Sequence, residues 1–212
     1  MSASPSSSLE IERKYDVDAG ARVPDWRSLP GVATVGAPEP RDLDARYLDT
    51  PDGRLAQART ALRRRTGGPD AGWHIKQSTP EGKLETLWPL GDDDADAAGE
   101  PVVPADIVAA LTGIAAPPFV VLARIRNART AYALRDGDGG LVAEFVDDRV
   151  TGVDVRRGGE TSWREWELEL GPAAPASEGE RAALFAAADA LVAAAGGRVS
   201  ASESKLGRAL GL

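Results

Sequence analysis

Two segments of the chain carry acidic residues at alternate positions, so that each segment presents its carboxylates on one side. Glu10, Glu12 and Lys14 occupy every other position of the first segment, and the range 165–169 repeats this spacing with three glutamates. A period of two is that of a β-strand, in which successive side chains point to opposite faces. Because like charges on one strand face repel each other, we expect a cation or basic side chains opposite them.

Other segments carry basic residues with the same spacing. Arg63 and Arg65 share one strand face, Arg124 and Arg126 share another, and Lys76 lies on a third. Each strand alone is also compatible with a half-buried sheet whose charged face lies in water. Solvated faces usually mix both signs of charge, however, so faces of a single sign indicate an enclosed site for charged ligands.

The composition restricts the kind of metal and partner that such a site binds. The chain has no cysteine and a single histidine, His74, so we expect a hard, oxygen-bound cation rather than zinc or iron. A formal net charge of −8 argues against a general nucleic-acid binder. The chain has no apolar run long enough to cross a bilayer, and residues 1–8 lack the pattern of a signal peptide, so a cytoplasmic protein without membrane contact is expected.

The elements that position these residues are mostly strands. Residues 1–7 are expected to form a disordered tail, and residues 8–212 a single domain. The expected strands span residues 9–17, 42–49, 60–66, 72–78, 83–90, 119–135, 141–150, 151–157 and 162–170. The expected helices span residues 104–111, 177–195 and 203–210. The helix at 177–195 has the strongest signals, since Ser177 and Glu180 form a capping box and Gly196 follows its end.

Residues 10–14 read Glu-Ile-Glu-Arg-Lys, which resembles the Glu-x-Glu-x-Lys signature of the CYTH domain family, also called triphosphate tunnel metalloenzymes. The resemblance covers roughly residues 9–206, because the later motifs follow in the family's order. These motifs are Tyr47-Leu48-Asp49-Thr50-Pro51, Leu62-Arg63-Arg64-Arg65, Trp73-His74-Ile75-Lys76, Glu85 with Pro89-Leu90, Arg124-Ile125-Arg126 with Arg129, Glu144 with Asp148, Glu165-Trp166-Glu167-Leu168-Glu169, and Ser204-Lys205.

The resemblance implies a mainly β fold of the α+β class, a closed eight-stranded antiparallel β-barrel that forms a tunnel with helices packed outside. It also implies a hydrolase that uses Mg²⁺ or Mn²⁺ to remove the terminal phosphoryl group of inorganic triphosphate or a small organic triphosphate. Three alternatives remain open. They are a class IV-type adenylate cyclase, a non-catalytic module that binds polyphosphate or nucleotides, and a triphosphatase acting on RNA ends.

The resemblance also implies roles for individual residues. The catalytic residues are Glu10, Glu12 and Lys14. The residues that bind the triphosphate are Arg63, Arg65, Lys76, Arg124, Arg126, Arg129 and Lys205. The metal ligands are Glu10, Glu12, Glu85, Asp148, Glu165, Glu167 and Glu169.

Two features of the sequence depart from a simple reading of this pattern. Arg129 breaks the alternation set by Arg124 and Arg126, so a β-bulge is expected to bring all three side chains inward. The family often has a second acid two residues after the position of Glu85, and here that residue is Leu87. The resemblance therefore leaves open whether one or two metal ions bind.

Overall fold

The computed structural model describes residues 4–91, 94–95, 99–202 and 204–212, and these residues form a mainly β fold with four α-helices. The strands are β1 (Ser6–Glu10), β2 (Glu12–Asp16), β3 (Thr34–Val35), β4 (Glu39–Asp49), β5 (Thr60–Thr66), β6 (Gly72–Thr79), β7 (Gly82–Pro89), β8 (Val120–Arg135), β9 (Leu141–Asp154), β10 (Gly159–Leu170) and β11 (Arg198–Val199). The helices are α1 (Arg54–Gln57), α2 (Ala105–Ala110), α3 (Glu178–Ala194) and α4 (Lys205–Leu210), with a short 3₁₀ helix, η1 (Trp26–Ser28).

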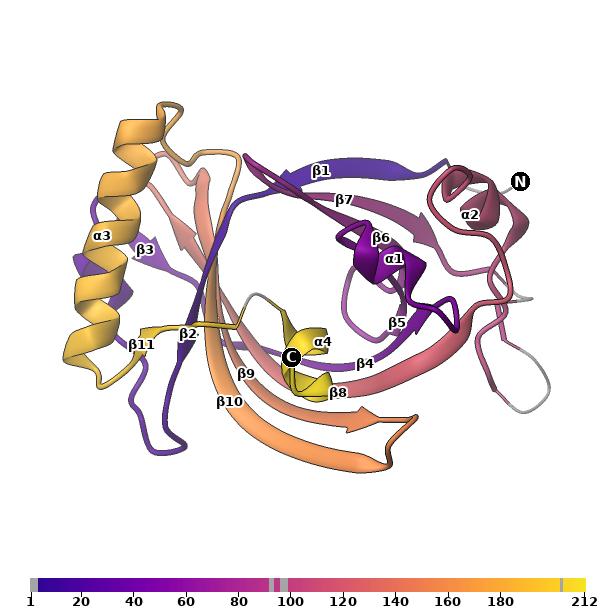
Figure 1. The fold of residues 1–212 in the computed structure, drawn as a ribbon. Helices are drawn as coiled ribbons and strands as arrows, with labels where there is room; N and C mark the ends of the chain where they lie inside the picture. Colours follow the sequence, from indigo (N-terminus) through magenta and orange to yellow (C-terminus); the bar gives the residue numbers. More distant parts are fainter. Residues whose placement is uncertain (1–3, 92–93, 96–98, 203) are drawn as a thin grey trace.

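All eleven strands belong to one antiparallel sheet. Its hydrogen-bonded order is β1-β7-β6-β5-β4-β8-β9-β10-β2-β11, and β3 pairs with β8 outside this path. The long strands curve strongly, so the sheet bends around a central space with α3 on its outer side (Figure 1). Such curvature places every second side chain of each strand on the concave face.

The expected closed eight-stranded barrel is wrong in two respects. The sheet has eleven strands, and within the described residues it is not closed by hydrogen bonds. The reason lies at Ile11, where the chain passes from β1, which pairs with β7, to β2, which pairs with β10. The covalent backbone thus joins the two ends of the sheet, and the carbonyl of Ile11 accepts a hydrogen bond of 2.9 Å from the backbone N–H of Leu170.

The outer face of the sheet is apolar where α3 covers it. Trp166 on β10 and Phe145 on β9 are fully buried there, and Phe185 of α3 belongs to the same core cluster. The helix expected at 177–195 is confirmed, since the Ser177 hydroxyl accepts a hydrogen bond from the backbone N–H of Glu180. This core fixes the apolar side of β9 and β10, so their charged side faces the central space.

The strands expected at 141–150 and 151–157 form one strand, β9. Gly152, which suggests a break in the sequence, is a packing position instead. A Cβ atom there would lie 2.7 Å from the Cβ of Ala209 and 3.2 Å from the ring of Trp163. The turn comes at Gly158, which has a φ of 72°.

The chain ends follow the expectation in part. Strand β1 begins at Ser6, inside the segment expected to be a tail, while residues 1–3 lie outside the described residues. The helix expected at 203–210 begins at Lys205, and residue 203 is not described. Within the described ranges, no helix has the length and apolar character to cross a bilayer.

Candidate functional site

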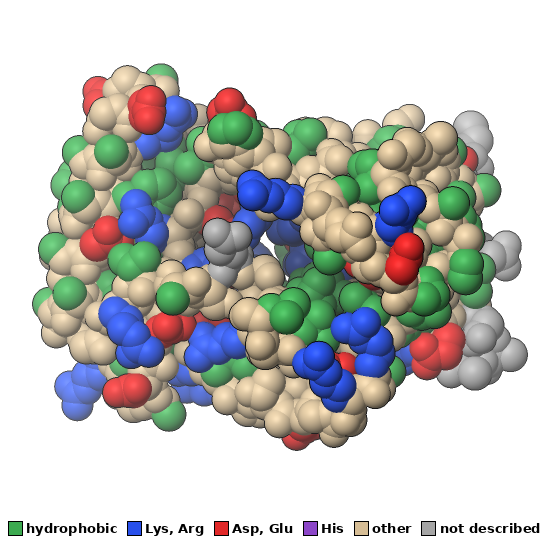
Figure 2. Space-filling view, in the orientation of Figure 1, with side chains coloured by type: hydrophobic (Ala, Val, Ile, Leu, Met, Phe, Trp, Pro, Cys, Tyr) green, Lys and Arg blue, Asp and Glu red, His purple; other side chains and the backbone are tan. Residues whose placement is uncertain are grey.

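The concave face of the sheet lines a cavity of about 350 Å³. Figure 2 shows Lys and Arg side chains around the central hollow. The residues that line the cavity are Ser8, Glu10, Glu12, Lys14, Arg41, Leu43, Ala45, Tyr47, Arg63, Arg65, Pro69, Asp70, Lys76, Lys83, Glu85, Ile125, Asn127, Arg129, Glu144, Glu167, Glu169, Ser204 and Lys205. Most of them are charged, so the cavity is suited to a highly charged ligand.

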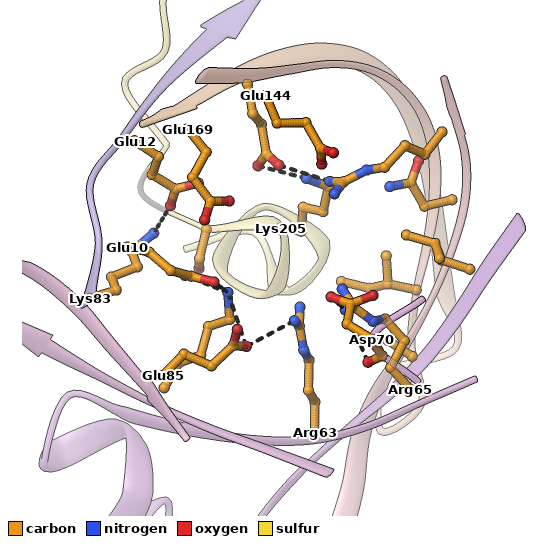
Figure 3. Close-up of a pocket in the computed structure, with 18 of the residues that line it drawn as sticks. Glu10, Glu12, Arg63, Arg65, Asp70, Lys83, Glu85, Glu144, Glu169 and Lys205 are labelled. Carbon is orange, nitrogen blue, oxygen red and sulfur yellow. Dashed lines mark hydrogen bonds and ion pairs between the residues drawn. The ribbon is translucent and has the colours of Figure 1, made fainter. Parts of the chain in front are cut away.

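Strand register places three carboxylates side by side on one wall. Glu12 of β2 lies opposite Glu169 of β10, and Glu169 lies opposite Glu144 of β9. Like charges in directly opposed positions destabilise a sheet. We give the name outer acidic cluster to Glu12 and Glu169 of this wall together with Glu10. Figure 3 shows the side chains of Glu10, Glu12 and Glu169 on the same side of the cavity.

Glu169 is the member of the outer acidic cluster whose charge is not compensated. It forms no hydrogen bond or ion pair with another described residue. Partial burial in the cavity and the nearby carboxylates of Glu10, Glu12 and Glu167 raise its pKa to about 7, although Glu169 remains exposed to solvent. Glu169 is therefore the position in this cluster where a bound cation would supply missing positive charge.

The other two members of the outer acidic cluster are paired with lysines. Lys76 Nζ lies 2.9 and 2.7 Å from the two oxygens of Glu10, and Lys83 Nζ lies 2.7 Å from Oε1 of Glu12. Burial raises the pKa of Glu10 despite this pair. Burial has the same tendency at Glu12, but Lys14 and Lys83 outweigh it and lower the pKa.

Arginines form the opposite side of the cavity. We call Arg63 and Arg65 of β5, together with Arg129 of β8, the arginine wall. Arg63 donates to Oε1 of Glu85 at 3.1 Å and to the Tyr47 hydroxyl at 3.3 Å. In Figure 3, Arg63 and Arg65 lie across the cavity from the outer acidic cluster.

Arg65 is the counterpart of Glu169 on the basic side. Burial and the nearby Arg63 and Arg129 lower the pKa of Arg65 to about 9, even though Asp70 contacts its guanidinium. The Nε atoms of Arg63 and Arg65 are buried and have no hydrogen-bond partner. The arginine wall therefore concentrates three guanidinium groups at the cavity, and a polyanion bound there would offset their mutual repulsion.

His74 supports the arginine wall from behind and does not line the cavity. It is fully buried on β6, and its Nδ1 lies 2.7 Å from Oε1 of Glu85. Burial and the positive charges of Arg63 and Arg65 lower the pKa of His74 to about 4, so the ring is neutral at pH 7. A neutral ring has one N–H, which can donate from Nδ1 to Glu85 or from Nε2 to the carbonyl of Asp70 at 3.1 Å, and the first of these bonds would hold Glu85 against Arg63.

Asp148, Glu165 and Glu167 form a second group, which we call the inner acidic cluster. One oxygen of each lies within 4.8 Å of the others. All three side chains are buried, and only Glu167 lines the cavity. Lys205 contacts all three, so this cluster carries its own counter-cation.

Arg124 and Arg126 lie outside the cavity, in contrast to the expectation. Arg124 pairs with Asp44, and Arg126 pairs with the exposed Glu160. The expected bulge between them and Arg129 does not exist, because β8 pairs with β9 in regular alternation from Ala123 to Leu134. Strict alternation therefore brings Arg129 inward with Asn127 and Ile125, and it turns Arg124 and Arg126 outward.

The other expected site residues are brought together. The following line the cavity: Glu10, Glu12, Lys14, Arg63, Arg65, Lys76, Glu85, Arg129, Glu167, Glu169 and Lys205. Asp148 and Glu165 lie directly behind its surface, in contact with Lys205. The structure thus gathers residues from eight strands and α4 around one space.

Four of the charged residues that line the cavity were not predicted from the sequence as site residues. They are Arg41, Lys83, Glu144 and Asp70. The alternation rule would have found Lys83 and Glu144, because each has the same parity as a neighbouring candidate, Glu85 or Asp148. Arg41 lies one residue before the expected strand and Asp70 lies in a loop, so neither carried a periodic signal.

One relative is similar to most of this chain in sequence. An uncharacterized protein of Mycobacterium tuberculosis is 37% identical over 178 residues, which cover 78% of this chain and 34% of that protein. The chain thus spans about a third of the length of this relative.

Two solved structures are similar in fold over nearly the whole chain. A candidate adenylate cyclase from Bacillus halodurans has a TM-score of 0.61 and 20% identity, with 95% of this chain and 97% of that chain covered. A candidate adenylyl cyclase from Hippeastrum, described as having a dominant triphosphatase activity, has a TM-score of 0.52 and 18% identity, with 96% of each chain covered.

The sequence itself matches a family model. The model of the CYTH domain matches residues 8–193, a range that contains the sheet from Ser8 onward up to β10, together with most of α3. The resemblance found at Glu10-Ile11-Glu12-Arg13-Lys14 is thereby confirmed, and this chain belongs to the CYTH domain family.

Proposed function

We propose that this protein is a metal-dependent triphosphatase that hydrolyses the terminal phosphoryl group of inorganic triphosphate or a small organic triphosphate. The observation that carries the proposal is the opposition of the outer acidic cluster and the arginine wall across one cavity. On one side, Glu169 has no hydrogen-bond or ion-pair partner among the described residues, and its pKa is raised to about 7. On the other side, neighbouring arginines and burial lower the pKa of Arg65 to about 9. A divalent cation and a polyanion that bind together would offset the like charges on both sides.

The outer acidic cluster fits a divalent metal ion. Glu10, Glu12 and Glu169 offer only carboxylate oxygens, which are the ligands that Mg²⁺ and Mn²⁺ prefer. The charge deficit at Glu169 supports this position over the inner acidic cluster, where Lys205 already supplies a cation. When bound, such an ion would neutralise phosphoryl oxygens and lower the pKa of water.

The side chains of the chain itself bind and orient the triphosphate in this proposal. Arg63, Arg65 and Arg129 contact oxygens of the phosphoryl groups that do not react, and Lys76 neutralises charge beside Glu10. Arginine suits this role because its planar fork binds two phosphate oxygens and its charge persists at every physiological pH. Positioning and electrostatics of this kind supply most of the rate acceleration in phosphoryl transfer.

The test is a panel of phosphate-release assays. Inorganic triphosphate, thiamine triphosphate and ATP are each assayed with Mg²⁺, with Mn²⁺ and with EDTA. The proposal predicts release of orthophosphate from at least one substrate with a metal ion, and none with EDTA. Formation of cyclic AMP from ATP in place of orthophosphate would identify an adenylate cyclase. Metal-independent binding of triphosphate without turnover would identify a binding module.

A further inference from the structure

The inner acidic cluster has the donor set of a divalent-cation site. Asp148, Glu165 and Glu167 each offer an oxygen, and these oxygens lie within 4.8 Å of one another. At most 8% of any of these residues is exposed. Buried carboxylates that lie this close together require a compensating cation, because neither water nor distance weakens their repulsion.

Lys205 of α4 supplies that cation. Its Nζ lies 2.9 Å from Oδ2 of Asp148, 2.6 Å from Oε1 of Glu165 and 2.8 Å from Oε1 of Glu167. Of these three ion pairs, the one with Glu167 is also a hydrogen bond, while Oε1 of Glu165 has no hydrogen-bond partner. Figure 3 shows Lys205 beside α4. The ammonium is therefore held among three carboxylates at a position where it offsets their charge.

The remaining oxygens of the inner acidic cluster are also engaged. Arg129 donates to both oxygens of Asp148, at 2.8 and 2.7 Å, and to Oε2 of Glu167 at 2.8 Å. The indole N–H of Trp163 donates to Oε2 of Glu165 at 2.5 Å. Side chains thus supply positive charge to all three carboxylates of this cluster, whereas Glu169, two residues beyond Glu167 on β10, has no such partner among the described residues.

We propose that Lys205 is a resident cation that takes the place of a divalent metal ion in the inner acidic cluster and thereby fixes the position of Glu167. Glu167 in turn contacts Lys14, which lines the cavity. Lys205 is therefore a positioning residue that acts on the ligand site through Glu167. This role goes beyond the proposed triphosphatase activity and does not depend on it.

The segment around Lys205 is anchored by other contacts, which makes a lysine variant informative. The backbone N–H of Ser200 donates to the carbonyl of Lys14 at 2.9 Å. The Ser200 hydroxyl and Arg208 contact Asp16 of β2 at 3.0 and 2.7 Å. Removal of the ammonium should therefore leave the C-terminal segment on the sheet.

The experiment counts Mn²⁺ ions by calorimetric titration of the full chain with MnCl₂, in the absence of any triphosphate. We expect Lys205→Ala to bind one more Mn²⁺ per chain than the unmodified protein. Lys205→Arg, which keeps a cation, should show the unmodified stoichiometry. The double variant Lys205→Ala/Glu165→Gln should lose the additional ion, because Glu165 belongs to the inner acidic cluster and does not line the cavity.

Each outcome decides the proposal. Equal stoichiometry in Lys205→Ala and the unmodified protein would overturn it, as would an additional ion that persists in the double variant. If Lys205→Ala unfolds in EDTA, refolding on addition of MnCl₂, followed by far-UV circular dichroism, supports the proposal, and failure to refold contradicts it. An unmodified protein that binds no Mn²⁺ would count against the proposed function alone, since the gain in Lys205→Ala is still measurable.

Discussion

The outer and inner acidic clusters are both built from carboxylates and both include residues of β10, yet their charges are balanced in different ways. Glu165 and Glu167 of the inner acidic cluster contact Lys205, whose pKa they and Asp148 hold well above its usual value although burial acts in the other direction. Glu169 of the outer acidic cluster, next on the same face of β10, has no partner among the described residues and a raised pKa.

This difference separates a structural use of buried charge from a functional one. A cluster that carries its own cation stabilises one arrangement of strands and has no vacancy for a ligand. A cluster that lacks a cation costs stability in the ligand-free protein and gains it when a cation binds. The arginine wall shows a related difference, since two buried carboxylates raise the pKa of Arg129, while burial and neighbouring arginines lower the pKa of Arg65 despite its contact with Asp70.

The largest effect is expected from the outer acidic cluster. Glu12→Gln removes a carboxylate that faces the proposed cation, so kcat for phosphate release should fall on the order of 10³-fold, in line with the loss of a preorganised electrostatic group. Glu160→Gln on β10 is the matched control and should change kcat less than twofold, because Glu160 is exposed outside the cavity. Comparable losses of kcat in Glu12→Gln and Glu160→Gln would contradict the distinction between the cavity face of the sheet and its exposed face.

The next largest effect is expected from a substitution in the arginine wall, where triphosphate affinity and the stability of the ligand-free protein should respond differently. Arg65→Met should weaken triphosphate binding by about tenfold or more, as expected for the loss of a charge-assisted contact of about 1.5–3 kcal/mol. It should change the melting temperature of the ligand-free protein little, because the repulsion of Arg65 by Arg63 and Arg129 offsets its contact with Asp70. Calorimetry and thermal unfolding measure the two quantities.

Arg126→Met is the control for that experiment. Arg126 lies on the outer face of β8 and pairs with the exposed Glu160, so neither the affinity for triphosphate nor the melting temperature should change appreciably. A marked loss of melting temperature in Arg65→Met would contradict the repulsion assigned to Arg65 within the arginine wall.

A smaller effect is expected from pH. Glu169 has a raised pKa of about 7, so it is protonated below that value in the metal-free protein and its proton competes with a cation. Affinity for Mn²⁺ should therefore rise with pH by up to about tenfold per unit below pH 7 and level off above it. In Glu169→Gln this slope should disappear, and a slope that persists would assign the titration to another group.

The smallest effect concerns Tyr47, whose hydroxyl lies 3.3 Å from Nη1 of Arg63. Tyr47→Phe removes one contact that orients this guanidinium, so KM should rise by about two- to fivefold while kcat stays nearly constant, the size expected for one net hydrogen bond. Steady-state kinetics measure both constants. A large fall in kcat would instead give Tyr47 a role in the chemical step.

Alternation along the strands was enough to predict most of the charged residues that line the cavity. The period of two placed Glu10 with Glu12, and Arg63 with Arg65, on the faces that line the cavity. The same rule, applied strictly, would have turned Arg124 outward once Arg129 was taken as an inward residue. The error came from assuming a bulge in order to keep all three arginines in the site.

Pairing and sheet closure could not be read from local sequence. The opposition of Glu12 and Glu169 depends on register between segments that are far apart in the chain. The passage between the two ends of the sheet at Ile11 depends on which strands flank β1 and β2. The choice of Lys205 as partner of the inner acidic cluster likewise depends on where the last helix packs.

The most direct test of the account measures whether cation and polyanion bind as a pair. Triphosphate affinity is determined by calorimetry with MnCl₂ and with EDTA, for the unmodified protein and for Glu169→Gln. The account predicts that Mn²⁺ strengthens triphosphate binding at least tenfold in the unmodified protein, and that Glu169→Gln abolishes most of this gain. Equal affinity with Mn²⁺ and with EDTA, or a gain that Glu169→Gln leaves intact, would contradict it.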